Sequence, residues 1–133
     1  MPHSFTVSAV MPAEAGDVYD AWLDSKAHAA MTGGGAARQS RKVGAGVAAW
    51  DGYISGKNLS LKAGERIVQS WRTTQFTAAD ADSRIDIRLE SSARGTKVTL
   101  THSNVPDGHT TYREGWKTHY FEPMKAYFKA RKK

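Results

Sequence analysis

The sequence contains no cysteine, so disulfides and thiolate metal ligands are excluded, and a reducing, cytoplasmic location is expected. It also lacks any run near the roughly 20 apolar residues that a membrane-spanning helix requires, which predicts no membrane insertion. The first residues show no basic stretch followed by an apolar run, so no signal peptide is expected.

Motifs of common catalytic and metal sites are also missing. There is no His-Glu-x-x-His and no pair of histidines four residues apart, so neither a metal site nor a cofactor is expected. No serine lies in a Gly-x-Ser-x-Gly motif, which leaves nucleophilic catalysis unsupported. The glycines at 33–35 are not followed by the Lys-Ser/Thr of a phosphate-binding loop, and they are interpreted as the end of a helix.

The net charge of +6 raises the question of a nucleic-acid partner. The cations are scattered except for Lys129, Arg131, Lys132 and Lys133, which suit the end of a C-terminal helix. No RNA-binding aromatic motif and no basic recognition helix occurs, so no nucleic-acid partner is expected. A length of 133 residues suits a single domain, 1–133, with a substantial core.

Hydrophobic periodicity predicts a strand first, then two short helices, then a series of strands. The expected strands are 5–10, 46–50, 53–62, 66–73, 84–90 and 96–103, and the short helices are 13–23 and 25–31. Asp51-Gly52 is a hairpin-type dipeptide, and Gly56 suggests a bulge or bend. Asp86 and Glu90 alternate with Arg84 and Arg88 on the solvent face of their strand, which predicts cross-strand ion pairs.

A long amphipathic helix closes the chain. On a helical wheel one stripe holds four residues, with Met124 and His119 at its flanks; the four are Trp116, Tyr120, Pro123 and Tyr127. The pattern Thr111-x-x-Glu114 predicts a capping box, although the helix could begin as early as Asp107. Pro123 removes a backbone hydrogen bond and should kink the helix.

This order of elements predicts an α+β fold, in which a curved antiparallel sheet wraps around the long C-terminal helix. The two short helices follow the first strand. A curved sheet touches such a helix mainly at its middle, and this geometry favours a cavity between sheet and helix.

Several motifs in this order carry a family resemblance: Trp22, Met31-Thr32-Gly33-Gly34, Val43-Gly44-Ala45-Gly46, Asp51-Gly52 with Gly56, Ile67-Val68-Gln69-Ser70-Trp71-Arg72, and Gly115-Trp116 with Tyr120-Phe121-Glu122. The whole chain resembles the activator of heat-shock-ninety ATPase homologue family of the START-like (SRPBCC, helix-grip) superfamily. The resemblance implies the helix-grip fold with a cavity. Members of the superfamily bind lipids, sterols, hormones or polyketides, and a few are enzymes.

Two departures bear on function. The eukaryotic co-chaperone of this family also has a large N-terminal domain that makes the main chaperone contact, whereas this sequence begins directly at the START-like segment. Met31 stands where many relatives carry an aromatic residue, at the expected mouth of the pocket.

The candidate ligand-binding residues are inward-facing aromatic and polar positions, because ligand pockets combine apolar walls with a few polar groups. They are Trp50, Gln69, Trp71, His102, Trp116, His119, Tyr120, Met124 and Tyr127. The alternative is that these side chains fill a closed core. His102 and His119 could meet and act as a general base or as a ligand anchor, or be ordinary core and rim residues. His28 and His109 are expected in exposed segments.

Three functions remain open at this point. The leading hypothesis is non-enzymatic binding of a small apolar or amphipathic ligand in the cavity, with no catalytic residue assigned. The family resemblance implies a second, a module that partners a heat-shock-ninety-type chaperone. An enzyme that uses a cavity histidine is the third. A monomer or a homodimer is expected, since exposed strand edges can pair between subunits.

Overall fold

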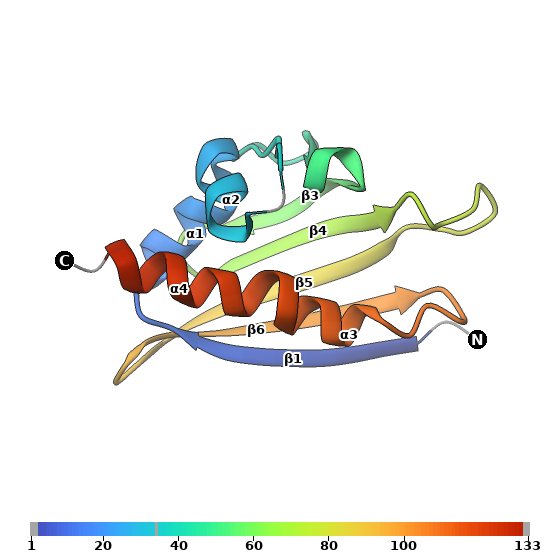
Figure 1. Ribbon diagram of the computed structural model, residues 1–133. Coiled ribbons are helices and arrows are strands. Elements are labelled where there is room, and N and C mark those ends of the chain that lie inside the picture. The colour runs from blue at the N-terminus through green and yellow to red at the C-terminus, as the bar shows by residue number, and fades with distance from the viewer. Residues whose placement is uncertain (1–2, 34, 132–133) are drawn as a thin grey trace.

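The computed structural model describes residues 3–33 and 35–131. Six antiparallel strands form one sheet in the order β1-β6-β5-β4-β3-β2 (Figure 1). The strands are β1 (His3–Met11), β2 (Gly46–Ala49), β3 (Ile54–Lys62), β4 (Arg66–Thr73), β5 (Ser83–Ser92) and β6 (Gly95–Val105). All six expected strands are present. β1, β5 and β6 extend one or two residues beyond the predicted bounds at each end, β4 matches them, and β2 and β3 are each one residue shorter.

The helices also confirm the expected α+β helix-grip arrangement. α1 (Ala15–Leu23) and α2 (Ser25–Thr32) follow β1, and a 3-10 turn (Trp50–Gly52) joins β2 to β3. The C-terminal helix consists of α3 (Tyr112–Gly115), a π-helical segment (Trp116–Phe121) and α4 (Glu122–Arg131). It runs along one face of the sheet, with α1 and α2 beside its end (Figure 1). No helix within the described residues is long and apolar enough to cross a membrane.

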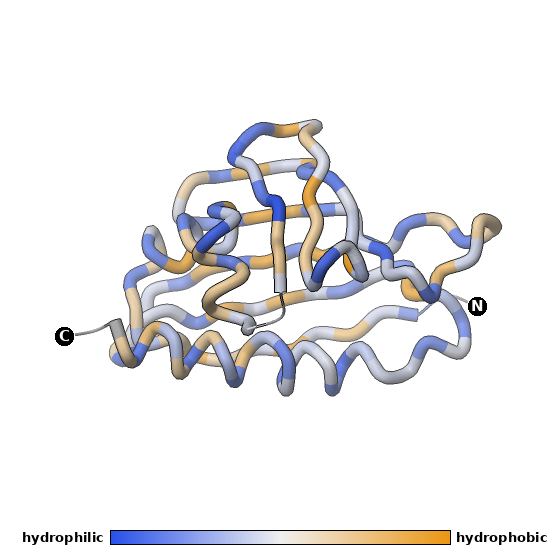
Figure 2. Tube along the Cα trace, turned by 45° about the horizontal axis from the view of Figure 1, so that its top comes forward, coloured by the Kyte–Doolittle hydropathy of each residue, from blue (hydrophilic) through white to orange (hydrophobic). Residues whose placement is uncertain are grey.

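The alternating strand pattern places the core between sheet and helix. In β5, Ile85, Ile87 and Leu89 are buried, whereas Arg84 and Arg88 are exposed. Figure 2 shows hydrophobic and hydrophilic positions alternating along the strands. The burial of the apolar side chains against the C-terminal helix is the main stabilising term of this fold.

On the outer face of the sheet, Asp86 of β5 forms a two-pronged ion pair with Arg66 of β4, with nitrogen–oxygen distances of 3.0 and 2.7 Å. Hydrogen bonding to Arg66 lowers the pKa of Asp86 below its usual range. The predicted cross-strand ion pairing is therefore confirmed at Asp86, whose main partner, Arg66, lies on the neighbouring strand β4.

Two details of the C-terminal helix differ from expectation. Thr111 occupies the N-cap position, but its side chain makes no capping hydrogen bond, so the predicted capping box is wrong. The backbone ahead of Pro123 forms a π-helical segment. A π segment winds more widely than an α-helix, so it shifts the phase of the side chains that follow.

That phase shift explains why the buried stripe only partly matches the predicted one. Pro123 and Tyr127, two of its expected members, are half-buried. The fully buried residues of the helix are Tyr112, Trp116, Tyr120, Phe121, Met124 and Phe128. Phe121 and Phe128 were not among the expected members, because a wheel of constant pitch does not anticipate the wider turn.

Gly56 has a different role from the predicted bulge. The register shift in β3 lies between Asn58 and Ser60, two residues further on. A Cβ atom at Gly56 would lie 1.8 Å from the backbone oxygen of Ser70 on β4. Glycine is required here because the two strand backbones approach too closely for any side chain.

We expect Gly56→Ala to destabilise the fold by about 3 kcal/mol, since backbone atoms must move to accept the methyl group. Gly16→Ala is the matched control, because a Cβ at this exposed position of α1 meets nothing within 4 Å. The control should be neutral or up to about 1 kcal/mol more stable. Urea unfolding measures both changes, and equal stabilities for the two variants would contradict the close-approach explanation.

Candidate functional site

An apolar groove of about 600 Å³ lies between the β2–β3 hairpin and the first turns of the C-terminal helix. The hairpin contributes Trp50, Tyr53 and Ile54, and β4 contributes Trp71. The remaining lining residues come from the segment that starts the helix: Thr110, Thr111, Tyr112, Glu114, Gly115, Trp116, Thr118, His119 and Tyr120. The volume lies within the usual range for small-molecule sites, about 300–1,000 Å³.

The groove brings together some of the candidate residues and leaves others outside. Trp50, Trp71, Trp116, His119 and Tyr120 line it. The other four do not: Gln69 borders a separate void of about 10 Å³, His102 and Met124 are fully buried, and Tyr127 packs half-buried against the core. The middle of the helix therefore packs directly against the sheet, and the open space lies at the start of the helix.

Sequence reasoning missed several lining residues, among them Tyr53, Ile54, Tyr112 and Glu114. Tyr53 and Ile54 follow the hairpin dipeptide, and their place opposite the helix depends on how the hairpin folds over it. The one available signal was aromatic character close to a turn, at Tyr53 and Tyr112, which was not distinctive enough to select them.

His102 is held in one neutral form by its hydrogen bonds. The indole Nε1–H of Trp116 donates to His102 Nδ1 at 3.0 Å, and an indole nitrogen can only donate. His102 Nδ1 is therefore the acceptor, and the proton is assigned to Nε2, which donates to Ser83 Oγ at 2.8 Å. Ser83 in turn donates to the backbone oxygen of Trp71. Both ring nitrogens of His102 are thus fully used inside the fold.

His28 corrects an expectation, because it is buried rather than exposed, with 1% of its surface accessible. Its Nδ1 lies 2.9 Å from the backbone oxygen of Trp22, and its Nε2 lies 2.9 Å from the Tyr120 hydroxyl. A carbonyl can only accept, so Nδ1 carries the proton and Tyr120 donates to Nε2. The burial arises because α2 packs against the C-terminal helix, a long-range contact that a local pattern does not reveal.

A second chain of hydrogen bonds connects the same region to the sheet. Trp22 Nε1 donates to Gln69 Oε1 at 3.1 Å, and Gln69 Nε2 donates to Asn58 Oδ1 at 2.8 Å. Gln69 thus serves to satisfy buried polar groups next to the groove. Buried polar groups without such partners would be strongly unfavourable.

Burial sets the protonation of these groups. It lowers the pKa of His28 to about 4, and, together with the nearby His3, it lowers the pKa of His102 to about 3. Burial also raises the pKa of the Tyr120 phenol. All three side chains are therefore uncharged at neutral pH, which suits the hydrogen bonds described above.

His102 and His119, the two histidines that the sequence suggested could meet, lie apart. His102 is enclosed under Trp116, whereas His119 is exposed at the rim of the groove and makes an edge contact with Trp50 at 5.6 Å between ring centroids. Neither a hydrogen bond nor a ring contact joins these two described residues. The other histidine expected in an exposed segment, His109, is half-buried and bonds to the Tyr112 hydroxyl at 3.0 Å.

Trp50 forms one wall of the groove and is the least constrained of the tryptophan side chains that line it. Its Nε1 is buried and makes no hydrogen bond within the described part of the chain. Trp50 lies close to the Tyr120 hydroxyl and lowers the pKa of Tyr120, which only partly offsets the rise caused by burial. The Trp50 N–H nevertheless does not meet the geometry of a hydrogen bond. Its backbone φ of 57° lies in the left-handed region that tryptophan rarely adopts.

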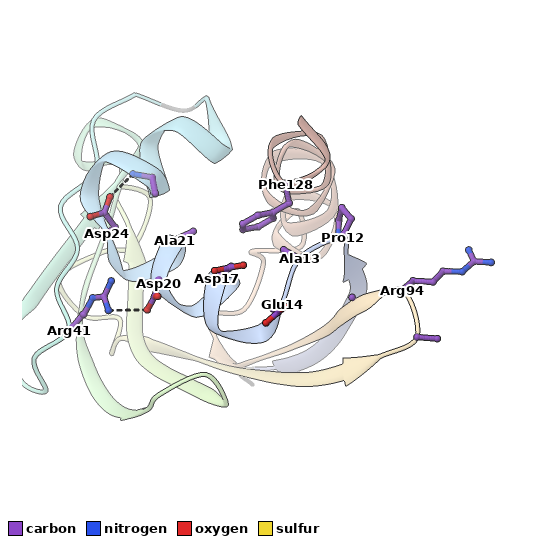
Figure 3. A pocket seen from close by; sticks show the side chains of 13 residues that line it. Pro12, Ala13, Glu14, Asp17, Asp20, Ala21, Asp24, Arg41, Arg94 and Phe128 are labelled. Atoms are coloured by element: carbon purple, nitrogen blue, oxygen red, sulfur yellow. Dashed lines mark hydrogen bonds and ion pairs between the residues drawn. The ribbon is translucent and has the colours of Figure 1, made fainter. Parts of the chain in front are cut away.

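A second, more polar groove of about 720 Å³ lies between α1, the β5–β6 turn and Phe128 of α4 (Figure 3). Of its α1-side carboxylates, Asp20 pairs with Arg41 at 2.9 Å, and Asp24 accepts from the backbone N–H of Ala27 at 2.9 Å. Ligand pockets are mostly apolar, so the aromatic groove is the stronger candidate. Within the described residues, no group of three or more His, Asp or Glu side chains is arranged to hold a metal ion.

Comparisons with known proteins agree with this architecture. The profile of the family described as "Activator of Hsp90 ATPase homolog 1-like protein" matches residues 12–129. No curated protein matches the chain.

Solved structures provide relatives of the same fold. An HSP90 activator from Plasmodium falciparum has a TM-score of 0.83 and 21% identity, over 94% of this chain and 95% of that one. Protein CV1439 from Chromobacterium violaceum has a TM-score of 0.77 and 22% identity, over 96% and 98% of the two chains. DynU16, from the dynemicin biosynthetic locus, has a TM-score of 0.77 and 16% identity, over 96% of this chain and 47% of that one.

We expect the protein to lose stability as the pH falls from about 6.5 towards 4. The unfolded chain binds protons at His28 and His102 with an ordinary pKa of about 6.5, whereas the folded chain binds them only near pH 4 and 3. Each histidine should lower the free energy of unfolding by up to about 1.4 kcal/mol per pH unit in that window.

Urea unfolding between about pH 7.5 and 4.5, a range that brackets the usual histidine pKa, measures this dependence. His119→Gln is the control, because it removes an exposed histidine instead of a buried one. A free energy of unfolding that stays constant across the range would show that the buried histidines are not held neutral.

Proposed function

We propose that this chain, which belongs to the Activator of Hsp90 ATPase homolog 1-like family, binds a small apolar or amphipathic molecule in the aromatic groove without chemical conversion. The observation that carries the proposal is the groove itself, about 600 Å³ in volume, in which six of the thirteen lining residues are tryptophan or tyrosine. Trp, Tyr and Phe rings offer large apolar contact areas to a ligand.

The site residues proposed for binding are those of the predicted set that line the groove: Trp50, Trp71, Trp116, His119 and Tyr120. Hydrogen bonds to buried histidines hold Trp116 and Tyr120 in place. Trp116 and Tyr120 form the floor of the groove. Because their side chains are already fixed, they lose little conformational freedom when a ligand binds, which favours affinity.

Catalysis by histidine receives no comparable support. Both nitrogens of His102 are used within the fold, and His119 lies exposed at the rim without a hydrogen-bonding partner among the described residues. A general base needs a partner that orients it and a position within reach of the reacting atom. Simple binding therefore explains the groove with fewer assumptions.

Filling the groove should abolish binding while the fold is kept. Gly115 lines the groove, and a Cβ at this helical position meets no atom closer than His119 Cδ2 at 4.0 Å. We expect Gly115→Leu to weaken binding of an uncharged apolar dye such as Nile red by about tenfold or more, because the side chain occupies the ligand's space. Ala126→Leu, on an exposed position of α4 outside the groove, is the matched control.

Native mass spectrometry of protein purified from its own host then looks for the natural ligand. A mass excess that disappears on denaturation, and that is missing from Gly115→Leu but present in Ala126→Leu, is the expected result. Equal dye binding by the two leucine variants would place the binding site elsewhere.

A chaperone partner is the second candidate, favoured by the family and by the fold shared with the HSP90 activator of Plasmodium falciparum. Such a module would act through its surface rather than through the groove. The expected result is stimulation of the ATPase of the cognate heat-shock-ninety chaperone, equal for the wild type and Gly115→Leu. No stimulation and no binding at tens of micromolar, on the order of weak transient complexes, would rule this candidate out.

A further inference from the structure

One unpaired hydrogen-bond donor marks the wall of the aromatic groove. Trp50 Nε1 is the single buried side-chain polar atom without a hydrogen bond among the residues that the structure describes. The corresponding atoms of Trp22 and Trp116 are both bonded, to Gln69 and His102. Native proteins satisfy nearly all buried polar groups, so an exception in a groove wall suggests a partner supplied from outside the chain.

The groove also has an unusual charge for so basic a protein. Among the residues that the structure describes, no lysine or arginine lines it, although the chain carries a net charge of +6. Its acidic lining residue is Glu114, which is exposed and makes no ion pair or hydrogen bond with any described residue. An anionic group placed in an apolar site without a positive partner is strongly unfavourable.

We propose that the groove selects an uncharged, largely apolar molecule that carries a carbonyl or similar neutral oxygen, and that this oxygen accepts a hydrogen bond from Trp50 Nε1. Carboxylates, sulfates and phosphates are selected against by Glu114 and by the absence of a cation. This inference rests on the proposed function and specifies its ligand class.

Turning the N–H of Trp50 from its buried position towards a ligand would break no hydrogen bond. The side chain is half-buried, and its Nε1 makes no bond that would have to be given up. Tyr120, next to it in the groove, cannot substitute, because its hydroxyl already donates to His28. The phenol of Tyr112 is likewise engaged, by Thr73 and His109.

Three ligands with one bicyclic body test the inference: indanone, which has a neutral acceptor; indane, which has none; and indane carboxylate, which is an anion. Binding is followed through the indole N–H peaks in a proton–nitrogen correlation NMR spectrum, where the Trp50 peak is the one that Trp50→Phe lacks. Indanone should move the Trp50 peak downfield, while the already bonded N–H peaks of Trp22 and Trp116 stay near their positions. Indane should bind without the downfield shift.

Trp50→Phe keeps an aromatic ring and removes the donor. It should weaken indanone binding by about threefold to tenfold more than it weakens indane binding, because both ligands lose the same part of the ring contact and only indanone loses the hydrogen bond. Glu114→Gln should strengthen binding of indane carboxylate by about threefold. Glu122→Gln removes the same charge from the same helix outside the groove and should have a smaller effect.

The outcomes separate this inference from the proposed function. The ligand class is wrong, while the groove remains a binding site, if Trp50→Phe weakens the binding of indanone and indane equally. The same holds if indane carboxylate binds the wild-type protein more tightly than indanone and indane do. If none of the three ligands moves any peak of a groove residue up to its solubility limit, both the ligand class and the proposed function are overturned.

Discussion

The rest of the structure depends on the burial of two neutral histidines against the C-terminal helix. Trp116 and Tyr120 each donate a hydrogen bond from this helix, the first to His102 on the sheet and the second to His28 on α2. Because His28 also bonds the backbone of Trp22, the helix is tied to the sheet and to both short helices. Protonation of either imidazole would remove an acceptor from the interior, so burial and neutrality require each other.

These bonds explain why the open space lies at one end of the fold. The rings of Trp22, Trp116 and Tyr120 pack against one another, with centroid distances of 4.8 to 6.3 Å. They fill the space that a curved sheet would otherwise leave beneath the helix. Both donors also lie in the π segment just before Pro123. Such segments often occur where a helix must orient particular side chains, and here that segment also forms the floor of the groove.

Sequence reasoning was reliable where the signal was local. The alternation in β5 and the Asp51-Gly52 turn predicted the corresponding strands and hairpin, and the ordered motifs predicted the family. It was weaker where the outcome depends on contacts between distant segments. His28 looks like a polar residue on a short exposed helix, and only the packing of α2 against the C-terminal helix buries it. The candidate residues were chosen from the alternation of apolar side chains along the strands and from the helical wheel. These patterns distinguish inward-facing from outward-facing positions, but they do not show whether the inward side chains fill the interior or line an open groove.

The groove therefore combines a fixed floor with a less constrained wall. Trp71, Trp116 and Tyr120 are almost fully buried and held by the interior, whereas Trp50 extends from a turn next to the four-residue edge strand β2, with φ of 57° at both Trp50 and Asp51. Non-glycine residues in this region persist only when their surroundings hold them, and here Asp51 accepts a 2.8 Å hydrogen bond from the backbone N–H of Ala36. A wall held from one side can adjust to a ligand while the floor keeps its shape. Substitutions in this hairpin would therefore change the shape of the groove while the fold stays the same, because a site can vary on a constant fold.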